Sequence, residues 1–376
     1  MKVTPWAVSG KTDFEKLIKE FGTTAIASEL LDRLKRHSPL HHMLERGFFF
    51  SHRDLDKVIE DFENGKGFFL YTGRAPSKPM HLGHVLPFEL TKWFQETFGV
   101  NLYIQIPDEE KFLAGKAASL KELEAIVQND MLHIAALGFN PGKTFIFRDR
   151  EFAGRMFDAA VLVAKKTTFS TAKAVFGFTE STNIGFSFYP ALQCVPTLFE
   201  KKRCLIPSAI DQDPFWRIQR DVAESLGYYK TAAIHSKFLP GLSGMDGKMS
   251  ASEEQTAIYL DDSEKTVLEK ISKYAFSGGQ ATIAEHRRLG GRTEADVSFQ
   301  WLSIFFEPDN KRLERIRQEY ESGGMLTSEL KEILIGKVNS FLKNHRKKKQ
   351  KAKALLKKFM YSGRLAKKMW EWRIEQ

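Results

Sequence analysis

The chain has 376 residues, of which 42% are hydrophobic and 28% charged, and its formal net charge at pH 7 is +10. This balance is that of an ordinary globular protein with enough length for two domains. No apolar run approaches the roughly 20 residues that a membrane-spanning helix needs, and the two cysteines offer neither a disulfide framework nor a metal-ligand spacing. These features exclude a membrane protein and a disulfide-rich secreted protein, and we expect a cytoplasmic location without a metal site.

The positive charge is concentrated at one end of the chain. The segment from Phe341 to Gln376 contains 13 Lys or Arg residues and only 2 Asp or Glu residues, so the remainder of the chain is close to neutral. A basic helical end on a neutral body indicates contact with a polyanion. A solvated, lysine-rich helix face is the alternative.

The first 60 residues form an N-terminal extension that we expect to pack on the main domain. A helical run at Phe14–Lys35 and the stretch GFFFS at Gly47–Ser51 both carry many apolar side chains. Such side chains are rarely left in solvent, so docking onto the core is the expected role of this extension.

From residue 61 to about 265, short apolar runs alternate with helical segments. The runs with strand character are Phe68–Thr72, Leu102–Ile106, Thr144–Phe147, Cys204–Ile206 and Ala232–Ile234. A longer helical insertion spans about residues 152–199. This alternation predicts an α/β domain with a doubly wound, parallel, Rossmann-like sheet, in which ligands bind beyond the carboxyl ends of the strands.

Residues 266–376 are predicted to form an α-helical domain with a basic tail. Apolar residues recur with helical spacing between Leu330 and Leu342, and the lysine-rich run Arg346–Lys358 follows. The candidate contacts to a polyanion are at the start of this run, at Lys347, Lys348 and Lys349.

The stretch Phe68–His84, FFLYTGRAPSKPMHLGH, has the pattern of a strand, a turn and the start of a helix. A helix start presents unpaired N–H groups and the positive end of a dipole, so it attracts phosphate. His81 and His84 can donate hydrogen bonds to phosphate oxygens, and Gly83 leaves room for a flat base against the backbone. A nucleotide site is therefore predicted, whereas a metal site is disfavoured because no third ligand accompanies the two histidines.

A second phosphate-binding pattern lies at residues 247–252, GKMSAS. Lys248 supplies a mobile positive charge, Ser250 and Ser252 supply hydroxyl groups, and the preceding glycines allow the loop to move. Such a loop can close over a triphosphate and stabilise the charge of departing pyrophosphate.

These two stretches resemble the HIGH and KMSKS signatures of class I aminoacyl-tRNA synthetases. The closer resemblance is to the tryptophanyl-tRNA synthetase family of the eukaryotic and archaeal type. It runs in order through YTGR (71–74), MHLGH (80–84), AIDQDP (209–214), KMSAS (248–252) and AFSGG (275–279). Tyrosine-specific relatives carry an acidic residue three positions after the Gln of a YPxxQ helix. Here that position, after Gln193, is Pro196, which favours tryptophan.

The resemblance implies an enzyme that activates L-tryptophan with ATP and Mg²⁺ and then transfers it to the terminal ribose of tRNA(Trp), with no tightly bound cofactor. Tryptophan would be held by Tyr71, Gln105, Glu110, Gln193 and Gln212. ATP would be held by Arg74, Lys111, Asp211 and Ser252. The catalytic set would be His81, Gly83, His84, Lys248, Met249 and Ser250. The resemblance further implies that residues 61–265 are the catalytic domain and that residues 266–376 bind the anticodon. Lys347, Lys348 and Lys349 would then lie near the tRNA. The chain would be a homodimer joined through residues 152–199.

Other function classes fit parts of the sequence. A tyrosyl-tRNA synthetase or another HxGH nucleotidyltransferase would share the fold, and a catalytically silent RNA-binding or signalling relative would share the basic tail. The intact histidines and Lys248 favour an active enzyme. In one departure from the family pattern, Ala251 replaces the second lysine of KMSKS, and we expect Lys111 to supply more of the positive charge.

Overall fold

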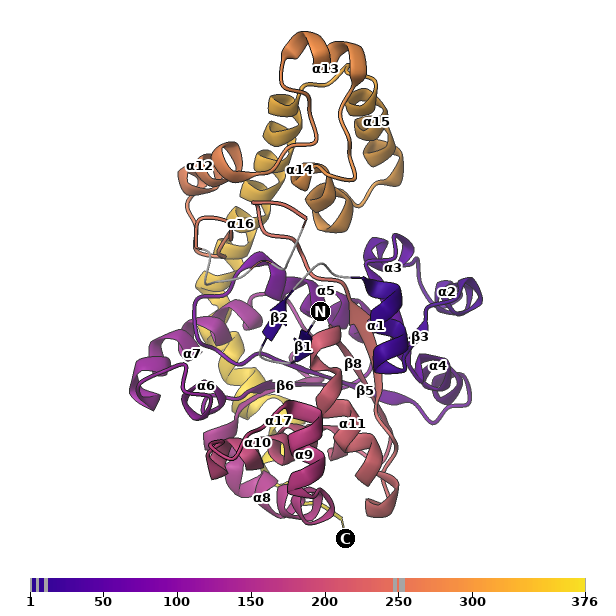
Figure 1. The fold of residues 1–376 in the computed structure, drawn as a ribbon. Coiled ribbons are helices and arrows are strands. Elements are labelled where there is room, and N and C mark those ends of the chain that lie inside the picture. Colours follow the sequence, from indigo (N-terminus) through magenta and orange to yellow (C-terminus); the bar gives the residue numbers. More distant parts are fainter. Residues whose placement is uncertain (1, 5–6, 10–12, 246–248, 250–253, 376) are drawn as a thin grey trace.

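The computed structural model describes residues 2–4, 7–9, 13–245, 249 and 254–375, with the first two ranges described by their backbone alone. Figure 1 shows an α/β body and, at one end of it, a group of helices formed by residues after about 264. Within the described ranges, no helix combines the length and the apolar character that crossing a membrane requires.

A seven-stranded sheet forms the centre of the body. Its strands lie in the order β3 (Thr24–Ala25), β4 (Phe49–Arg53), β9 (Ala232–Ser236), β8 (Arg203–Ala209), β5 (Phe68–Gly73), β6 (Leu102–Ile106) and β7 (Thr144–Arg148). The strands β5 to β9 pair in parallel, which confirms the predicted α/β fold class and all five predicted strands. The order of the strands reverses at β5, which lies between β6 and β8, so a crevice is expected at their carboxyl ends.

The N-terminal segment adds two strands that its sequence pattern did not indicate. β4 pairs antiparallel with β9, and β3 pairs antiparallel with β4. The three consecutive phenylalanines before Ser51 hide the alternation of a strand, and the partner strand comes far later in the chain. The other elements of this segment are the hairpin β1 (Lys2–Thr4) and β2 (Ala7–Ser9) and the helices α1 (Phe14–Phe21), α2 (Ser28–Lys35), α3 (His42–Glu45) and α4 (Leu55–Glu63).

Helices cover both faces of the sheet and enclose two hydrophobic cores. In β5, Phe68 and Leu70 enter one core, while Phe69 and Tyr71 enter the other, as the alternation of side chains along a strand requires. The first face carries α5 (Leu82–Phe98) and α7 (Leu120–Ala135), while the short helix α6 (Glu110–Leu113) packs against the helix at residues 184–194. The second face carries α8 (Asp149–Lys166), α9 (Phe169–Phe176), α10 (Ile184–Cys194), η1 (Val195–Leu198), η2 (Ile210–Gln212), α11 (Asp213–Val222) and η3 (Glu224–Leu226).

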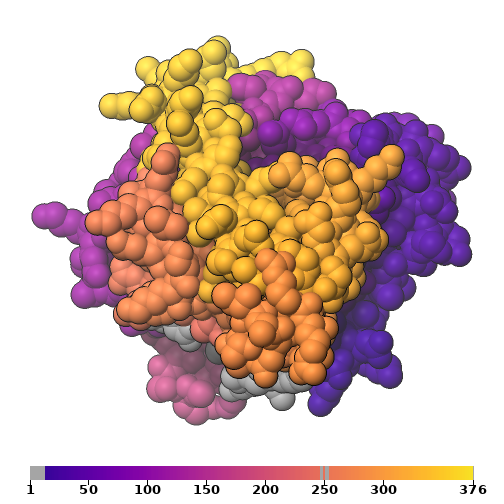
Figure 2. Space-filling model, turned by 90° about the horizontal axis from the view of Figure 1, so that it is seen from above, coloured from indigo at the N-terminus to yellow at the C-terminus, as the bar shows by residue number. Residues whose placement is uncertain are grey.

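The C-terminal part is helical, as predicted, and returns to the body at its end. It consists of α12 (Glu264–Tyr274), α13 (Ile283–Leu289), α14 (Val297–Trp301), η4 (Leu302–Phe306), α15 (Asn310–Glu321), α16 (Thr327–Lys357), η5 (Lys358–Ser362) and α17 (Arg364–Trp370). The long helix α16 leaves the helical group and runs along α7, after which α17 packs against β7 (Figure 1). Seen from above, the orange and yellow residues of this part cover that end of the molecule, with the indigo N-terminal segment along one side (Figure 2).

Candidate functional site

A cavity of about 550 Å³ opens at the carboxyl edge of the parallel strands. Residues at the ends of three strands line it: Gly73 at the end of β5 with Arg74 after it, Asp211 and Gln212 after β8, and Lys237 after β9. The cavity therefore lies beside the reversal of strand order, where ligands bind in open α/β sheets.

The start of α5 forms one wall of this cavity. His81 precedes the helix in extended conformation, and its backbone N–H donates to Nδ1 of His84 at 3.2 Å. The two imidazole rings stack with centroids 3.6 Å apart. Between them in the chain lies Gly83, where an added Cβ would come within 3.2 Å of the His81 ring. The three predicted residues His81, Gly83 and His84 all line the cavity.

The second phosphate-binding pattern reaches the same cavity at Met249. This residue lines the cavity, and its backbone N–H donates to the carbonyl of Leu239 at 2.7 Å. A Cβ placed on Gly83 would lie 3.7 Å from the Cβ of Met249, so the two motifs face each other. The other predicted residues of this motif, which lie outside the described residues, are Lys248, Ser250 and Ser252.

The chain that follows this motif pairs with the start of α5. The backbone N–H of Leu82 donates to the carbonyl of Ile258, and that of Leu260 donates to the carbonyl of Met80, both at 3.0 Å. The two segments form an antiparallel bridge at this point. Two motifs that are distant in the sequence are thereby held in register at one cavity wall.

Two of the predicted ATP-binding cations already contact carboxylates. The guanidinium of Arg74 forms an ion pair with the buried Asp130 of α7 and donates to the carbonyl of Lys78 at 2.7 Å. The amino group of Lys111 lies 2.8 Å from the carboxylate of Glu110 on α6. Because Arg74 and Lys111 also line the cavity, a bound phosphate would share them with these carboxylates.

Three of the residues expected to bind an amino acid form a buried hydrogen-bonded group. The hydroxyl of Tyr71 donates to Oε1 of Gln105, and Nε2 of Gln193 donates to the Tyr71 oxygen at 2.8 Å. The hydroxyl of Tyr189 donates to Oε1 of Gln193 at 2.5 Å. Burial raises the pKa of Tyr71 well above its usual value, so this hydroxyl remains a neutral donor.

This group lies next to the cavity rather than in its lining. Thr72 and Gly73, which follow Tyr71 in β5, both line the cavity. Of the two remaining predicted residues, Gln212 lines the cavity and Glu110 is buried beside Lys111 at its edge. The five residues predicted to bind tryptophan are therefore divided between the cavity, which Gln212 lines, and the buried region beside it.

The carboxyl group that orients Gln105 belongs to Asp149, which lies in none of the sequence motifs. Nε2 of Gln105 lies 2.8 and 2.7 Å from the two carboxylate oxygens of Asp149, so its Oε1 is directed toward Tyr71. Asp149 directly follows β7, and this position at the carboxyl edge of the sheet is the signal by which it could have been found.

Asp149 interacts with a second buried carboxyl group, that of Glu109. Burial is the main cause that raises the pKa of both groups, that of Glu109 to about 7, and the two side chains are linked by a hydrogen bond. Two neighbouring carboxyl groups in a buried place favour retention of one proton. The pair therefore keeps a proton near neutral pH.

The three lysines expected to contact a polyanion do not face the same way. Lys347 and Lys348 are exposed on α16. The amino group of Lys349 instead lies 2.7 Å from a carboxylate oxygen of Asp261 and donates to the side-chain oxygen of Asn129 at 2.7 Å. Lys349 thus ties α16 to the body of the protein.

Comparisons with known proteins give a consistent result. A family model described as tRNA synthetases class I (W and Y) matches residues 63–343. The tryptophan–tRNA ligase of Saccharolobus solfataricus is 58% identical over 370 residues, which cover 98% of this chain and 97% of that protein. The tryptophan–tRNA ligase of Pyrococcus furiosus is 55% identical over 371 residues, 98% of this chain and 96% of that protein.

Solved structures are similar over the same extent. The tryptophanyl-tRNA synthetase from Plasmodium falciparum has a TM-score of 0.89 at 38% identity, covering 94% of this chain and 99% of that chain. The tryptophanyl-tRNA synthetase from Encephalitozoon cuniculi bound to tryptophan has a TM-score of 0.86 at 36% identity, covering 94% and 98%. The similarity therefore includes both the α/β body and the helical part.

The substitution Glu109→Gln is expected to change how stability depends on pH. The native carboxyl pair keeps a proton up to about pH 7, whereas an unfolded glutamate releases its proton near its ordinary pKa of 4.5. Because the native state binds more protons in this range, the free energy of unfolding should fall as the pH rises from 4.5 to about 7. The variant should lose the part of this fall that Glu109 contributes, while the buried Asp149 keeps its own, and urea unfolding at a series of pH values would measure the difference.

Glu60→Gln, at an exposed position of α4, is the matched control and should retain the slope of the original protein. Equal slopes in both variants would contradict a shared proton.

Proposed function

Because the chain belongs to the class I tRNA synthetases of the tryptophan and tyrosine family, we propose that it activates L-tryptophan with ATP and transfers it to tRNA(Trp). The observation that carries this proposal is the approach of Gly83 to Met249, because it brings the HxGH and KMSAS motifs to one cavity. A nucleotide bound between them would meet donors from both sides.

In the first step, the tryptophan carboxylate attacks the α-phosphorus of ATP, which enters with Mg²⁺ as part of the substrate, and pyrophosphate leaves on the opposite side. The protein supplies no nucleophile; it positions the reactants and stabilises the developing charge. His81 and His84 donate to phosphate oxygens, Gly83 gives space for the base, and Lys248 with Ser250 acts on the departing phosphates. Arg74, Lys111, Asp211 and Ser252 complete the ATP site.

In the second step, the 2′ hydroxyl of the terminal ribose of tRNA attacks the carbonyl carbon of tryptophanyl-adenylate. The ester bond to the ribose forms as the bond to the phosphate breaks, and AMP leaves. No tightly bound cofactor takes part in either step. The reaction is that of a cytoplasmic enzyme of translation.

Tyr71 and Gln105 recognise the indole N–H, while Glu110, Gln193 and Gln212 hold the ammonium and carboxylate groups of tryptophan. The amide of Gln105 is suited to this task because Asp149 occupies its N–H groups and leaves Oε1 as the acceptor. A site built to pair with such a donor rejects an analogue that lacks it by a factor of about 10⁴–10⁵. Phenylalanine is excluded on this ground.

The helical domain binds the anticodon region of tRNA, and the exposed lysines of α16 contact its phosphates. Lys347 and Lys348 are exposed and available for this contact, whereas Lys349 would first have to break its ion pair with Asp261. We therefore assign the phosphate contacts mainly to Lys347 and Lys348.

The chain forms a homodimer through the insertion at residues 152–199. Apolar side chains on three helices of this insertion are exposed, namely Phe157 (59%), Val161 (43%), Phe169 (47%) and Ile184 (89%). Phe157 and Val161 are four residues apart and share one face of α8. An exposed apolar patch of this kind supports an interface between two copies of the chain.

Tryptophan-dependent exchange of pyrophosphate into ATP tests the proposed reaction, and His84→Ala tests its catalytic set. We expect exchange with tryptophan but not with tyrosine, and an approximately 100-fold lower kcat in the variant, because loss of one preorganised donor has about this effect. tRNA binding should remain unchanged.

His37→Gln is the matched control, because His37 contacts Phe98 at the opposite end of α5. Exchange supported by tyrosine would favour the alternative tyrosyl-tRNA synthetase. tRNA binding without any exchange would favour a catalytically silent RNA-binding relative.

Replacement of Lys347 and Lys348 by glutamine tests the tRNA contact. Each lost phosphate contact should reduce the slope of log K against log salt concentration by about 1, so the double variant should lose about 2. Filter binding of tRNA at several salt concentrations measures the slope, with Lys35→Gln on α2 as the control. An unaltered slope would remove this face of α16 from the tRNA-binding surface.

The double substitution Phe157→Glu and Ile184→Glu tests the dimer. Buried charges of like sign on an apolar interface should dissociate it, so sedimentation should give the mass of one chain. Ile283→Glu, at an equally apolar residue of α13 that is 67% exposed, should leave the mass unchanged. A dimer in both variants would place the interface elsewhere.

A further inference from the structure

The N-terminal segment holds α11 through two ion pairs. Arg53, the last residue of β4, pairs with Asp213, the first residue of α11. Asp54 pairs with Arg220, about 10 Å further along the same helix. Each side contributes one arginine and one aspartate, so both ends of α11 are held by ion pairs from the last residue of β4 and the residue that follows it.

The Arg53–Asp213 pair has well-defined geometry. Nε of Arg53 lies 2.6 Å from Oδ1 of Asp213 and Nη2 lies 2.8 Å from Oδ2, a two-point contact that fixes the plane of the carboxylate. Asp213 is fully buried, and Arg53 exposes 13% of its side chain. Nη1 of Arg53 also donates at 3.0 Å to the carbonyl of Gly22, which ends α1. Arg53 is therefore held from two sides.

Two further groups face the carboxylate of Asp213. Nε of Arg217 lies at 3.1 Å, and Nε2 of His235 at 3.4 Å. Burial alone would raise the pKa of Asp213, but hydrogen bonds from Arg53 and His235 outweigh burial and hold this pKa well below its usual range. Because Arg217 and His235 remain when Arg53 is replaced, the carboxylate does not lose all its partners.

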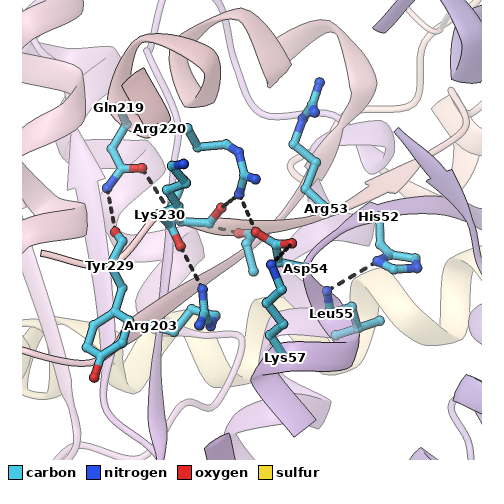
Figure 3. Close-up of polar contacts among 12 residues, drawn as sticks. His52, Arg53, Asp54, Leu55, Lys57, Arg203, Gln219, Arg220, Tyr229 and Lys230 are labelled. Carbon is cyan, nitrogen blue, oxygen red and sulfur yellow. Dashed lines mark hydrogen bonds and ion pairs between the residues drawn. The ribbon is translucent and has the colours of Figure 1, made fainter. Parts of the chain in front are cut away.

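The second pair uses an unusual backbone conformation. Asp54 has φ 50° and ψ 27°, a left-handed conformation that is unfavourable for a residue with a side chain. Its carboxylate forms no cap on α4 and instead lies 2.6 Å from Nη1 of Arg220 and 3.0 Å from Nζ of Lys57. Figure 3 shows Asp54 between these two cations, with Arg53 pointing away from it. Consecutive residues thus reach different ends of α11.

The start of α11 is adjacent to the cavity, whereas its far end is not. Asp211 and Gln212, which immediately precede Asp213, both line the cavity. Arg220 lies instead against the carbonyl of Thr231, at the start of β9, away from the carboxyl ends of the strands. A shift of Asp213 would therefore move cavity residues, while a shift at Arg220 would not.

We propose that Arg53 is a positioning residue for tryptophan activation, which acts through Asp213 to keep Gln212 and Asp211 in place at the cavity. The N-terminal segment then has a defined role in the amino-acid site, although none of its charged groups needs to touch the substrate. This inference rests on the proposed function, since the carboxylate of tryptophan is the group that Gln212 would meet.

Arg53→Met tests the proposal, with Arg220→Met as the matched control at the other pair. Misplacement of a binding group by about 1 Å costs up to about 100-fold, so we expect Arg53→Met to raise the KM for tryptophan by about tenfold or more. Arg220→Met should lower the thermal midpoint without changing this KM. Arg53→Lys keeps the charge but loses the two-point contact, and it should restore the KM only in part.

Amide hydrogen exchange of residues 208–216 gives a second readout that does not depend on the reaction. Exchange should accelerate in Arg53→Met and remain slow in Arg220→Met. If both variants change the KM equally, or if Arg53→Met changes neither the KM nor the exchange, the proposal is overturned. If Arg53→Met does not fold, an unchanged KM in Arg53→Lys overturns it. Absence of tryptophan-dependent activity in the original protein would instead refute the proposed function, while hydrogen exchange would still decide the positioning role.

Discussion

The pairing of residues 80–82 with residues 258–260 is the constraint on which the site depends. Two backbone hydrogen bonds of 3.0 Å join the start of α5 to the chain that follows the KMSAS motif. Backbone pairing fixes direction and register, so the histidines and Met249 face one cavity whatever nucleotide is bound. Side-chain contacts alone would leave this register less well defined.

The part of the site that we propose to bind the amino acid depends on polar groups that are costly to bury. Tyr71, Gln105 and Asp149 form a chain in which each donor has an acceptor, and Glu109 shares its proton at the end. A buried side-chain amide can flip, which exchanges the positions of its oxygen and its NH₂ group. For Gln105 this flip is disfavoured because it would place Oε1 against the carboxyl oxygens of Asp149. In the proposed function, the orientation of Gln105 toward the indole N–H therefore depends on Asp149, which is not among the residues proposed to contact the substrate.

The body and the helical domain are joined more closely than two separate domains would be. α16 begins in the helical domain and ends against the body, and Lys349 and Arg346 hold the segment 261–262 through Asp261 and the carbonyl of Asp262. This segment directly follows the residues that pair with the start of α5. The helix that presents Lys347 and Lys348 to solvent is thus connected, through a few residues, to the nucleotide site.

Local sequence patterns were enough to predict the motifs and most of the elements of this protein, apart from the strands of its N-terminal segment. Five strands, the helix start after Met80 and the basic helix could be predicted because periodicity, turn residues and charge runs report on neighbouring positions in the chain. The family resemblance placed the cavity residues for the same reason, since each motif is a local stretch. These features need no knowledge of how the chain folds back on itself.

Which side chains contact each other depends on how the chain folds back on itself. The tertiary structure placed Phe49–Arg53 as a strand between β3 and β9, Asp149 beside Gln105, Lys349 beside Asp261 and Arg53 beside Asp213. The members of each pair are separated by tens to hundreds of residues, and their contact follows from the order of strands in the sheet or, for Lys349, from the packing of α16 on the body. Asp149 could have been suspected from its position directly after β7. Arg53 and Lys349 have the same local pattern whether they face solvent or a distant partner, so the sequence contains no signal that distinguishes the two cases for them.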